Sequence, residues 1–66
     1  MTTKQKTIKT IQFYLKNRGK WISFANDAET VNIICRLANL QIVTVNQYGQ
    51  ARINPHNAKL YLLERS

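Results

Sequence analysis

Apolar residues near the start of the chain recur at the spacing of a helix. Ile8, Ile11 and Leu15 lie three and four residues apart, so they share one face of a backbone that turns about every 3.6 residues. Gly19 follows the last of them and suits the C-cap position. The pattern predicts an amphipathic helix over residues 4–18.

The next segment alternates between outward and inward positions. Residues 20–24 read Lys-Trp-Ile-Ser-Phe, a composition rich in aromatic and β-branched side chains that is typical of a strand. Ile22 and Phe24 are expected to face the core. Trp21 then lies on the opposite face or at the sheet edge.

Residues 26–29 predict the start of a second helix. Asn26 suits the N-cap and Glu29 the N3 position, in a variant of the capping box. Asp27 and Glu29 also lie where the positive end of the helix dipole favours acids. We expect this helix to run from Asp27 to about Asn39, with a structural role for both carboxylates.

The periodicity of this helix divides it into two faces. Its predicted buried face has Val31, Ile34 and Ala38 at the centre and Cys35 and Leu37 at the sides. Its predicted exposed stripe comprises Glu29, Asn32, Arg36 and Asn39. Cys35 is therefore expected to be a small core side chain.

After Leu40 the apolar period changes to two. Residues 41–45 and 50–53 predict two strands of a β-hairpin, joined by a turn over residues 46–49. Asn46 and Gly49 fit a type I turn followed by a bulge with glycine in the left-handed region. The inward face of the hairpin is predicted to consist of Val43, Val45, Ala51 and Ile53, leaving Thr44, Gln50 and Arg52 outward.

The last segment predicts a short helix capped by Asn54, with Pro55 in its first turn. One apolar face comprises Ala58, Tyr61 and Leu62. Leu60 and Leu63 form a second apolar side. Either this side contributes to a homodimer through Leu60, Tyr61 and Leu63, or it packs against Phe13.

Length and charge extend this picture. The 66 residues suffice for one domain with a thin core, so residues 1–66 are expected to form a single domain in which residues 1–5 are a flexible basic N-terminal arm. Ten lysines and arginines against three acids give a net charge of +7. Because two of the acids are assigned to the second helix start, this imbalance points to a polyanionic partner.

Several classes of protein are disfavoured by the residue inventory. Cys35 is the only cysteine and His56 the only histidine, so neither a disulfide framework nor a metal site is expected. No pair of acids has a spacing suited to catalysis. The sequence shows no signal peptide and no apolar run long enough to span a bilayer. We expect a cytoplasmic protein that is not an enzyme, with no cofactor, metal, membrane or small-molecule substrate.

The order helix, strand, helix, β-hairpin, helix resembles that of winged-helix domains. Residues 30–53, TVNIICRLANLQIVTVNQYGQARI, resemble the recognition helix and wing of small bacterial, archaeal and phage members of that family. Arg36-Leu37, Ile42-Val43 and Tyr48-Gly49 hold the matching positions. One departure is the helix that usually precedes the recognition helix, because only residues 19–25 are available and they read as a strand.

The resemblance and the charge together imply an α+β, winged-helix-like domain with a small three-stranded antiparallel sheet. Its expected partner is double-stranded DNA, in a regulatory or architectural role. Base contacts are assigned to Asn32, Arg36 and Asn39, and wing-tip contacts to Gln47, Tyr48 and Gln50. Phosphate contacts are assigned to Lys4, Lys6, Lys9, Lys16, Lys20 and Arg52.

Two alternatives use the same fold differently. The domain could be a protein-interaction module, a phage- or plasmid-type adaptor or inhibitor that docks on a host protein through Phe13, Trp21 or Tyr48. RNA binding is less favoured, because a sheet this small and aliphatic offers few aromatic side chains for base stacking.

Overall fold

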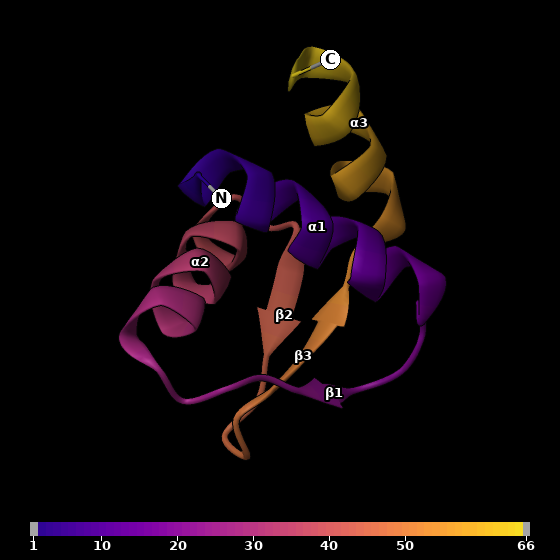
Figure 1. The fold of residues 1–66 in the computed structure, drawn as a ribbon. Helices are drawn as coiled ribbons and strands as arrows, with labels where there is room; N and C mark the ends of the chain where they lie inside the picture. The colour runs from indigo at the N-terminus through magenta and orange to yellow at the C-terminus, as the bar shows by residue number, and fades with distance from the viewer. Residues whose placement is uncertain (1, 66) are drawn as a thin grey trace.

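Three helices and three short strands follow one another in the predicted order (Figure 1). The structure is a computed structural model that describes residues 2–65. The helices are α1 (Thr3–Lys16), α2 (Ala28–Asn39) and α3 (Pro55–Arg65), and the strands are β1 (Ile22–Ser23), β2 (Val43–Val45) and β3 (Gln50–Ile53). The α+β class is confirmed.

The three strands form one antiparallel sheet in the order β1-β3-β2. β3 is the central strand, with Ala51 opposite both Ile22 and Val45. The turn of the hairpin is built by Asn46, whose Oδ1 accepts hydrogen bonds from the backbone N–H groups of Tyr48 and Gln50. Gly49 adopts the predicted left-handed conformation, with φ 74°.

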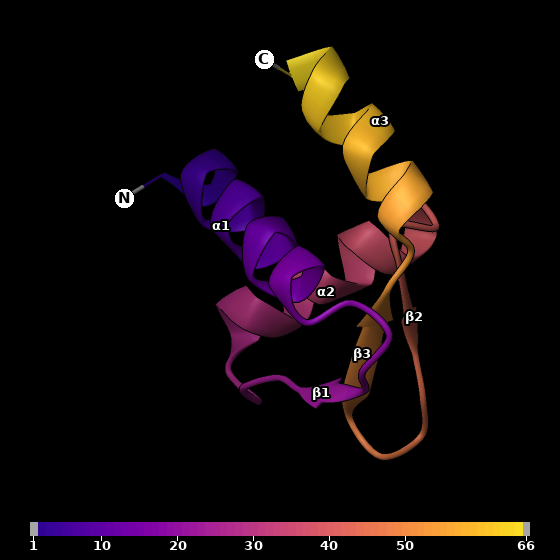
Figure 2. The same ribbon diagram turned by 90° about the vertical axis from the view of Figure 1, so that its right-hand side faces the viewer.

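The core lies between the helices and the inner face of the sheet. Its largest fully buried side chains are Ile11, Ile34, Leu37 and Ile42. Figure 2 shows α1 and α2 beside the sheet, whereas the C-terminal half of α3 projects away from the body of the molecule. Only the first turns of α3 contribute a fully buried residue, Ala58.

The first helix begins earlier and ends earlier than predicted. Thr2 caps it, with its Oγ1 accepting from the Gln5 N–H and its own N–H donating to Gln5 Oε1. This capping box places residues 3–5 in α1, so the prediction of an arm over residues 1–5 is wrong for them, while Met1 lies outside the described residues. The C-cap is Asn17, whose N–H donates to the Tyr14 carbonyl, and Gly19 lies in the following loop.

The start and the buried face of α2 also differ from the prediction. Its N-cap is Asp27 and not Asn26, because the Asp27 carboxylate accepts from the Thr30 N–H at 3.0 Å. The fully buried residues are Ile33, Ile34 and Leu37, so the face is rotated toward α1. Val31 and Ala38 are half-buried, and Cys35 is exposed rather than in the core.

β3 spans the predicted residues 50–53, whereas β1 and β2 are shorter than predicted. β2 begins at Val43, because Gln41 adopts a φ of 62° and the Ile42 N–H still donates to the Leu37 carbonyl at the end of α2. Val45, predicted inward, is 40% exposed, since it lies at the distal end of the hairpin beyond the helices (Figure 1). β1 keeps only Ile22 and Ser23 of the predicted five residues.

Candidate nucleic-acid interface

The outer face of α2 presents an uninterrupted polar stripe. Asn32, Arg36 and Asn39 are exposed, as predicted. They lie opposite Ile34 and Leu37, which anchor the other side of the helix in the core. Within residues 2–65 the side chains of these three residues make no hydrogen bond or ion pair. Their donors and acceptors are therefore available to a partner molecule.

Cys35 belongs to this same surface. At about 100° per residue, the exposed residues of α2 follow around the helix in the order Glu29, Arg36, Asn32, Asn39, Ala28 and Cys35. Sequence reasoning missed this thiol because an apolar side chain at the edge of a helical stripe fits either face. The stripe thus has a carboxylate at one edge and a thiol at the other.

The hairpin carries a second group of exposed side chains. The Arg52 guanidinium lies 5.0 Å from the centroid of the Trp21 ring, a distance at which cation–π attraction operates. Tyr48 is 76% exposed at the tip, and Gln47 beside it is also exposed. Gln50 differs, because its Oε1 accepts from Asn46 Nδ2 and its side chain is part of the turn.

The fold places α2 and the hairpin next to each other. β2 follows α2 after only three residues, and the two elements are in contact. The strands lead away from the helices, so that the turn between β2 and β3 lies at the far end of the sheet (Figure 1 and Figure 2). The exposed stripe therefore lies on a helix that contacts strand β2 of the hairpin.

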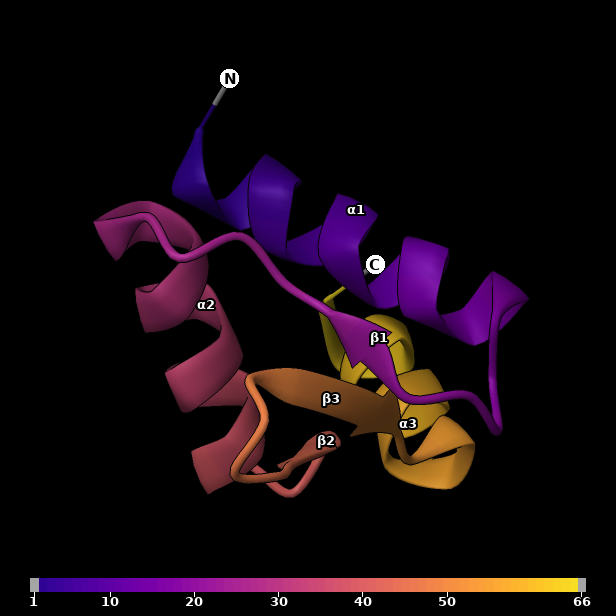
Figure 3. The ribbon, with the colours of Figure 1, turned by 90° about the horizontal axis from the view of Figure 1, so that it is seen from below.

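Most of the predicted phosphate-binding lysines lie elsewhere. Lys9 and Lys16 are exposed on the side of α1 that faces away from the core. Figure 3 shows α1 along one edge of the molecule and α2 along an adjoining edge, so their outer faces point in different directions. Lys4 lies in the first turn of α1, and Lys20 lies just before β1.

One predicted phosphate contact is already engaged within the chain. Lys6 Nζ lies 2.8 Å from Glu29 Oε1 and 2.8 Å from Glu29 Oε2. This is the one ion pair among the described residues, and it joins α1 to the first turn of α2. Arg18 and Lys59 were not assigned a role, yet both are as exposed as the predicted lysines.

The N-cap carboxylate has a similar structural role. Hydrogen bonds from the backbone and side chain of Thr30 hold the pKa of Asp27 below its ordinary value, because they stabilise the charged form. Both acids at the start of α2 thus have a structural role, as the sequence predicts, but Glu29 pairs with Lys6 and is not the N3 residue of the predicted capping box.

Neither a metal site nor a membrane-spanning helix lies among the described residues. No three histidine, cysteine or acidic side chains lie together among residues 2–65 as a metal ion would require. No helix in this range is both long and apolar enough to cross a membrane. Comparisons with protein-family models, with curated proteins and with solved structures find no match to this chain.

Proposed function

We propose that the protein binds double-stranded DNA, with α2 in the major groove and the β2–β3 hairpin beside it, in a winged-helix-like arrangement and a regulatory or architectural role. The observation that carries this proposal is the unpaired polar stripe of α2 next to an exposed hairpin. The sheet order β1-β3-β2 and the net charge of +7 agree with it.

The stripe has the chemistry of base readout. A helix fits the major groove of B-DNA, where arginine pairs with guanine and asparagine with adenine through two hydrogen bonds each. Arg36 lies between Glu29 and Asn32 around the helix. Because Glu29 is already paired with Lys6, the Arg36 guanidinium is free to make the proposed guanine contact.

Phosphate contacts come from basic residues around the stripe. Arg52 of β3 lies against Trp21, which immediately precedes β1, and Lys20 comes directly before that tryptophan. The lysines on the outer face of α1 point away from this surface and contribute mainly through the long-range positive field.

A titration of fluorescein-labelled duplex DNA, followed by fluorescence anisotropy at several salt concentrations, tests the proposal. We expect binding that weakens steeply with salt, because cations on the protein displace counterions. For a duplex selected from a random pool, Arg36→Ala should weaken binding about tenfold, the cost of one lost bidentate base contact.

Arg18→Ala is the matched control, since Arg18 is an exposed arginine in the loop between α1 and β1, away from α2 (Figure 3). It should change affinity far less than Arg36→Ala. Absence of binding at low salt overturns the proposal. If Arg36→Ala and Arg18→Ala weakened binding equally, the protein would bind DNA through sequence-independent phosphate contacts and not through base contacts of α2.

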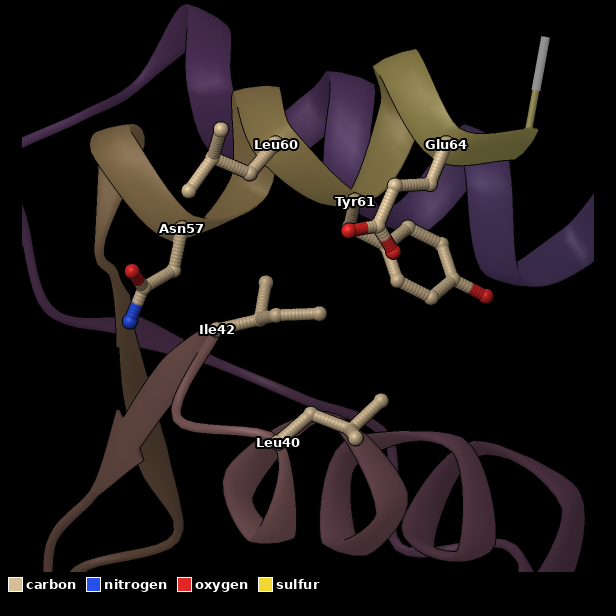
Figure 4. A pocket seen from close by; sticks show the side chains of 6 residues that line it. All are labelled: Leu40, Ile42, Asn57, Leu60, Tyr61 and Glu64. Carbon is tan, nitrogen blue, oxygen red and sulfur yellow. The ribbon is translucent and has the colours of Figure 1, made fainter.

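We further propose that the protein is a homodimer joined through α3. Leu60 and Leu40 are each about half exposed, and with Ile42 and Tyr61 they line a pocket of about 230 Å³ between α3 and the end of α2 (Figure 4). Sedimentation should show a dimer that Leu60→Glu dissociates; a monomeric wild-type protein would contradict this.

A further inference from the structure

The outer face of α1 carries an exposed aromatic ring between two lysines. Lys9, Phe13 and Lys16 lie four and three residues apart, which places them on one face of the helix. Phe13 is 52% exposed, and its only ring contact in the described chain is edge-on to Tyr14, with the centroids 5.6 Å apart. Phe13 is not part of the core cluster, so the exposed part of its ring can contact a partner.

Phe13 borders a groove that has an apolar floor. The groove has a volume of about 300 Å³ and lies between α1, the end of β1 and the first turns of α2. Tyr14, Phe24 and Ile34 form its apolar lining. Residues 24–27 connect β1 to α2 without forming a helix or strand (Figure 3), and Phe24 and Ala25 of this segment line the groove.

The charges around Phe13 favour one kind of occupant. Lys9 and Lys16, with Gln12, border a second depression beside Phe13, and neither lysine has an ion pair within the described chain. The nearest acids are engaged elsewhere, Glu29 by Lys6 and Asp27 by Thr30. The rim therefore offers two unpaired cations on either side of an apolar ring.

We propose that this surface, formed by Lys9, Phe13, Lys16 and the adjoining groove, binds an acidic amphipathic helix of a protein partner. The apolar side chain of the partner enters the groove against Phe13, and its carboxylates pair with the two lysines. Lys9 and Lys16 are two helical turns apart, about 10 Å along the axis. The partner therefore carries two acids two turns apart with an apolar residue between them.

Other polyanions fit this surface less well. A phosphate backbone would meet the lysines but offers nothing apolar to cover Phe13 and the groove floor. A lipid surface is flat, whereas this site is concave. The proposal does not depend on DNA binding, because it concerns the outer face of α1 and not that of α2.

An NMR titration with a synthetic peptide tests the proposal. The probe is an alanine-based helical peptide of about the length of α1, with two glutamates two turns apart and leucines between them. In the isotope-labelled full chain we expect amide shifts at Thr10, Phe13, Phe24 and Thr30. Phe13→Ala should weaken binding at least about tenfold, as expected for a buried aromatic anchor.

The lysines are tested with the double variant Lys9→Gln, Lys16→Gln, which should weaken binding and remove most of its salt dependence. Lys59→Gln on α3 and Tyr48→Ala at the hairpin tip are matched controls and should leave the affinity unchanged. Thermal unfolding verifies that each variant is folded. If Phe13→Ala does not fold, the lysine double variant still tests the proposal.

A peptide in which lysines replace the glutamates should not bind. The proposal is overturned if the acidic peptide causes no shifts, if the shifts map to the pocket between α2 and α3, or if both peptides bind equally. Since no DNA is present, these outcomes are independent of the duplex titration. Loss of DNA binding with peptide binding intact would reject only the proposed function.

Discussion

Asp27 shows how one side chain sets the start of a helix. Its carboxylate accepts from the Thr30 N–H and lies where the unpaired N–H groups of α2 favour negative charge. Either Asn26 or Asp27 suits an N-cap by residue type. The choice falls on Asp27 because its backbone is extended, with ψ 155°, immediately before the first helical residue.

The lowered pKa of Asp27 predicts the direction of one contribution to acid stability. A carboxyl whose folded pKa lies below its unfolded value, near 4, stabilises the fold above the unfolded pKa, and that stability is lost as pH falls through the folded pKa. Asp27→Asn keeps an acceptor but removes the titration. Urea unfolding between pH 6 and about 2 should therefore show a shallower loss of stability on the acid side.

Glu64→Gln is the control for this measurement, because Glu64 is an exposed acid in the last turns of α3 with no ion pair in the described chain. It should keep the acid slope of the original protein. An unchanged slope in Asp27→Asn would show that the hydrogen bonds from Thr30 do not perturb this carboxyl.

Gly49 is required by backbone conformation and not by space. Its φ is 74°, and a Cβ added there would meet no atom within 4 Å. Gly49→Ala should therefore destabilise the fold by about 1 kcal/mol through left-handed strain alone. Gly49→Asn should cost less, because asparagine tolerates this region better. Urea unfolding of the two variants decides: an alanine variant at least as stable as the asparagine variant would contradict this account.

At the scale of elements, the periodicity of the sequence predicted where the helices and the hairpin lie, but it did not predict the buried face of α2 correctly. Val31, Ile33, Ile34 and Cys35 are all apolar, so more than one rotation of α2 satisfies the same pattern. Packing against α1 and the sheet selects the rotation in which Ile33 is buried and Cys35 is exposed. Arg36 is exposed in either rotation, which is why the central residue of the candidate site could be predicted from sequence.

The position of the lysines could not be predicted in the same way. The sequence places Lys9 and Lys16 on the outer side of the first helix, but the angle between that helix and α2 depends on tertiary packing. Consequently the sequence grouped these lysines with Arg36 in one site, whereas the structure places them on an adjoining face around Phe13 (Figure 3).

The rotation of α2 leads to a direct comparison of two neighbouring residues. Ile33 is 6% exposed and packs in the core, whereas Cys35 is exposed. Ile33→Ala should lower the free energy of unfolding by about 2–5 kcal/mol through lost burial and a cavity. Cys35→Ser should change it by less than about 0.5 kcal/mol. Urea unfolding under reducing conditions measures both changes in the free energy of unfolding. If Cys35→Ser were the more destabilising variant, Cys35 would lie on the buried face, as predicted from sequence.

For the whole molecule, the net charge of +7 has a consequence for stability as well as for partners. The basic side chains repel one another, and salt screens this repulsion over distances of about 10 Å at 0.1 M. Salt also weakens the Lys6–Glu29 pair, but a solvent-exposed pair contributes at most about 1 kcal/mol. With one ion pair among residues 2–65 against a net charge of +7, we expect repulsion to dominate.

The free energy of unfolding should therefore rise as sodium chloride is added. Urea is the denaturant for this measurement because it carries no charge and does not itself screen the repulsion. The double variant Lys20→Gln, Lys59→Gln removes two of the seven surplus charges from exposed positions, so its stability should depend less on salt. A fall in stability with salt in the original protein would mean that attraction outweighs repulsion on this surface. Because the same surplus charge is proposed to attract a polyanion, this measurement tests the strength of the positive field without requiring the partner.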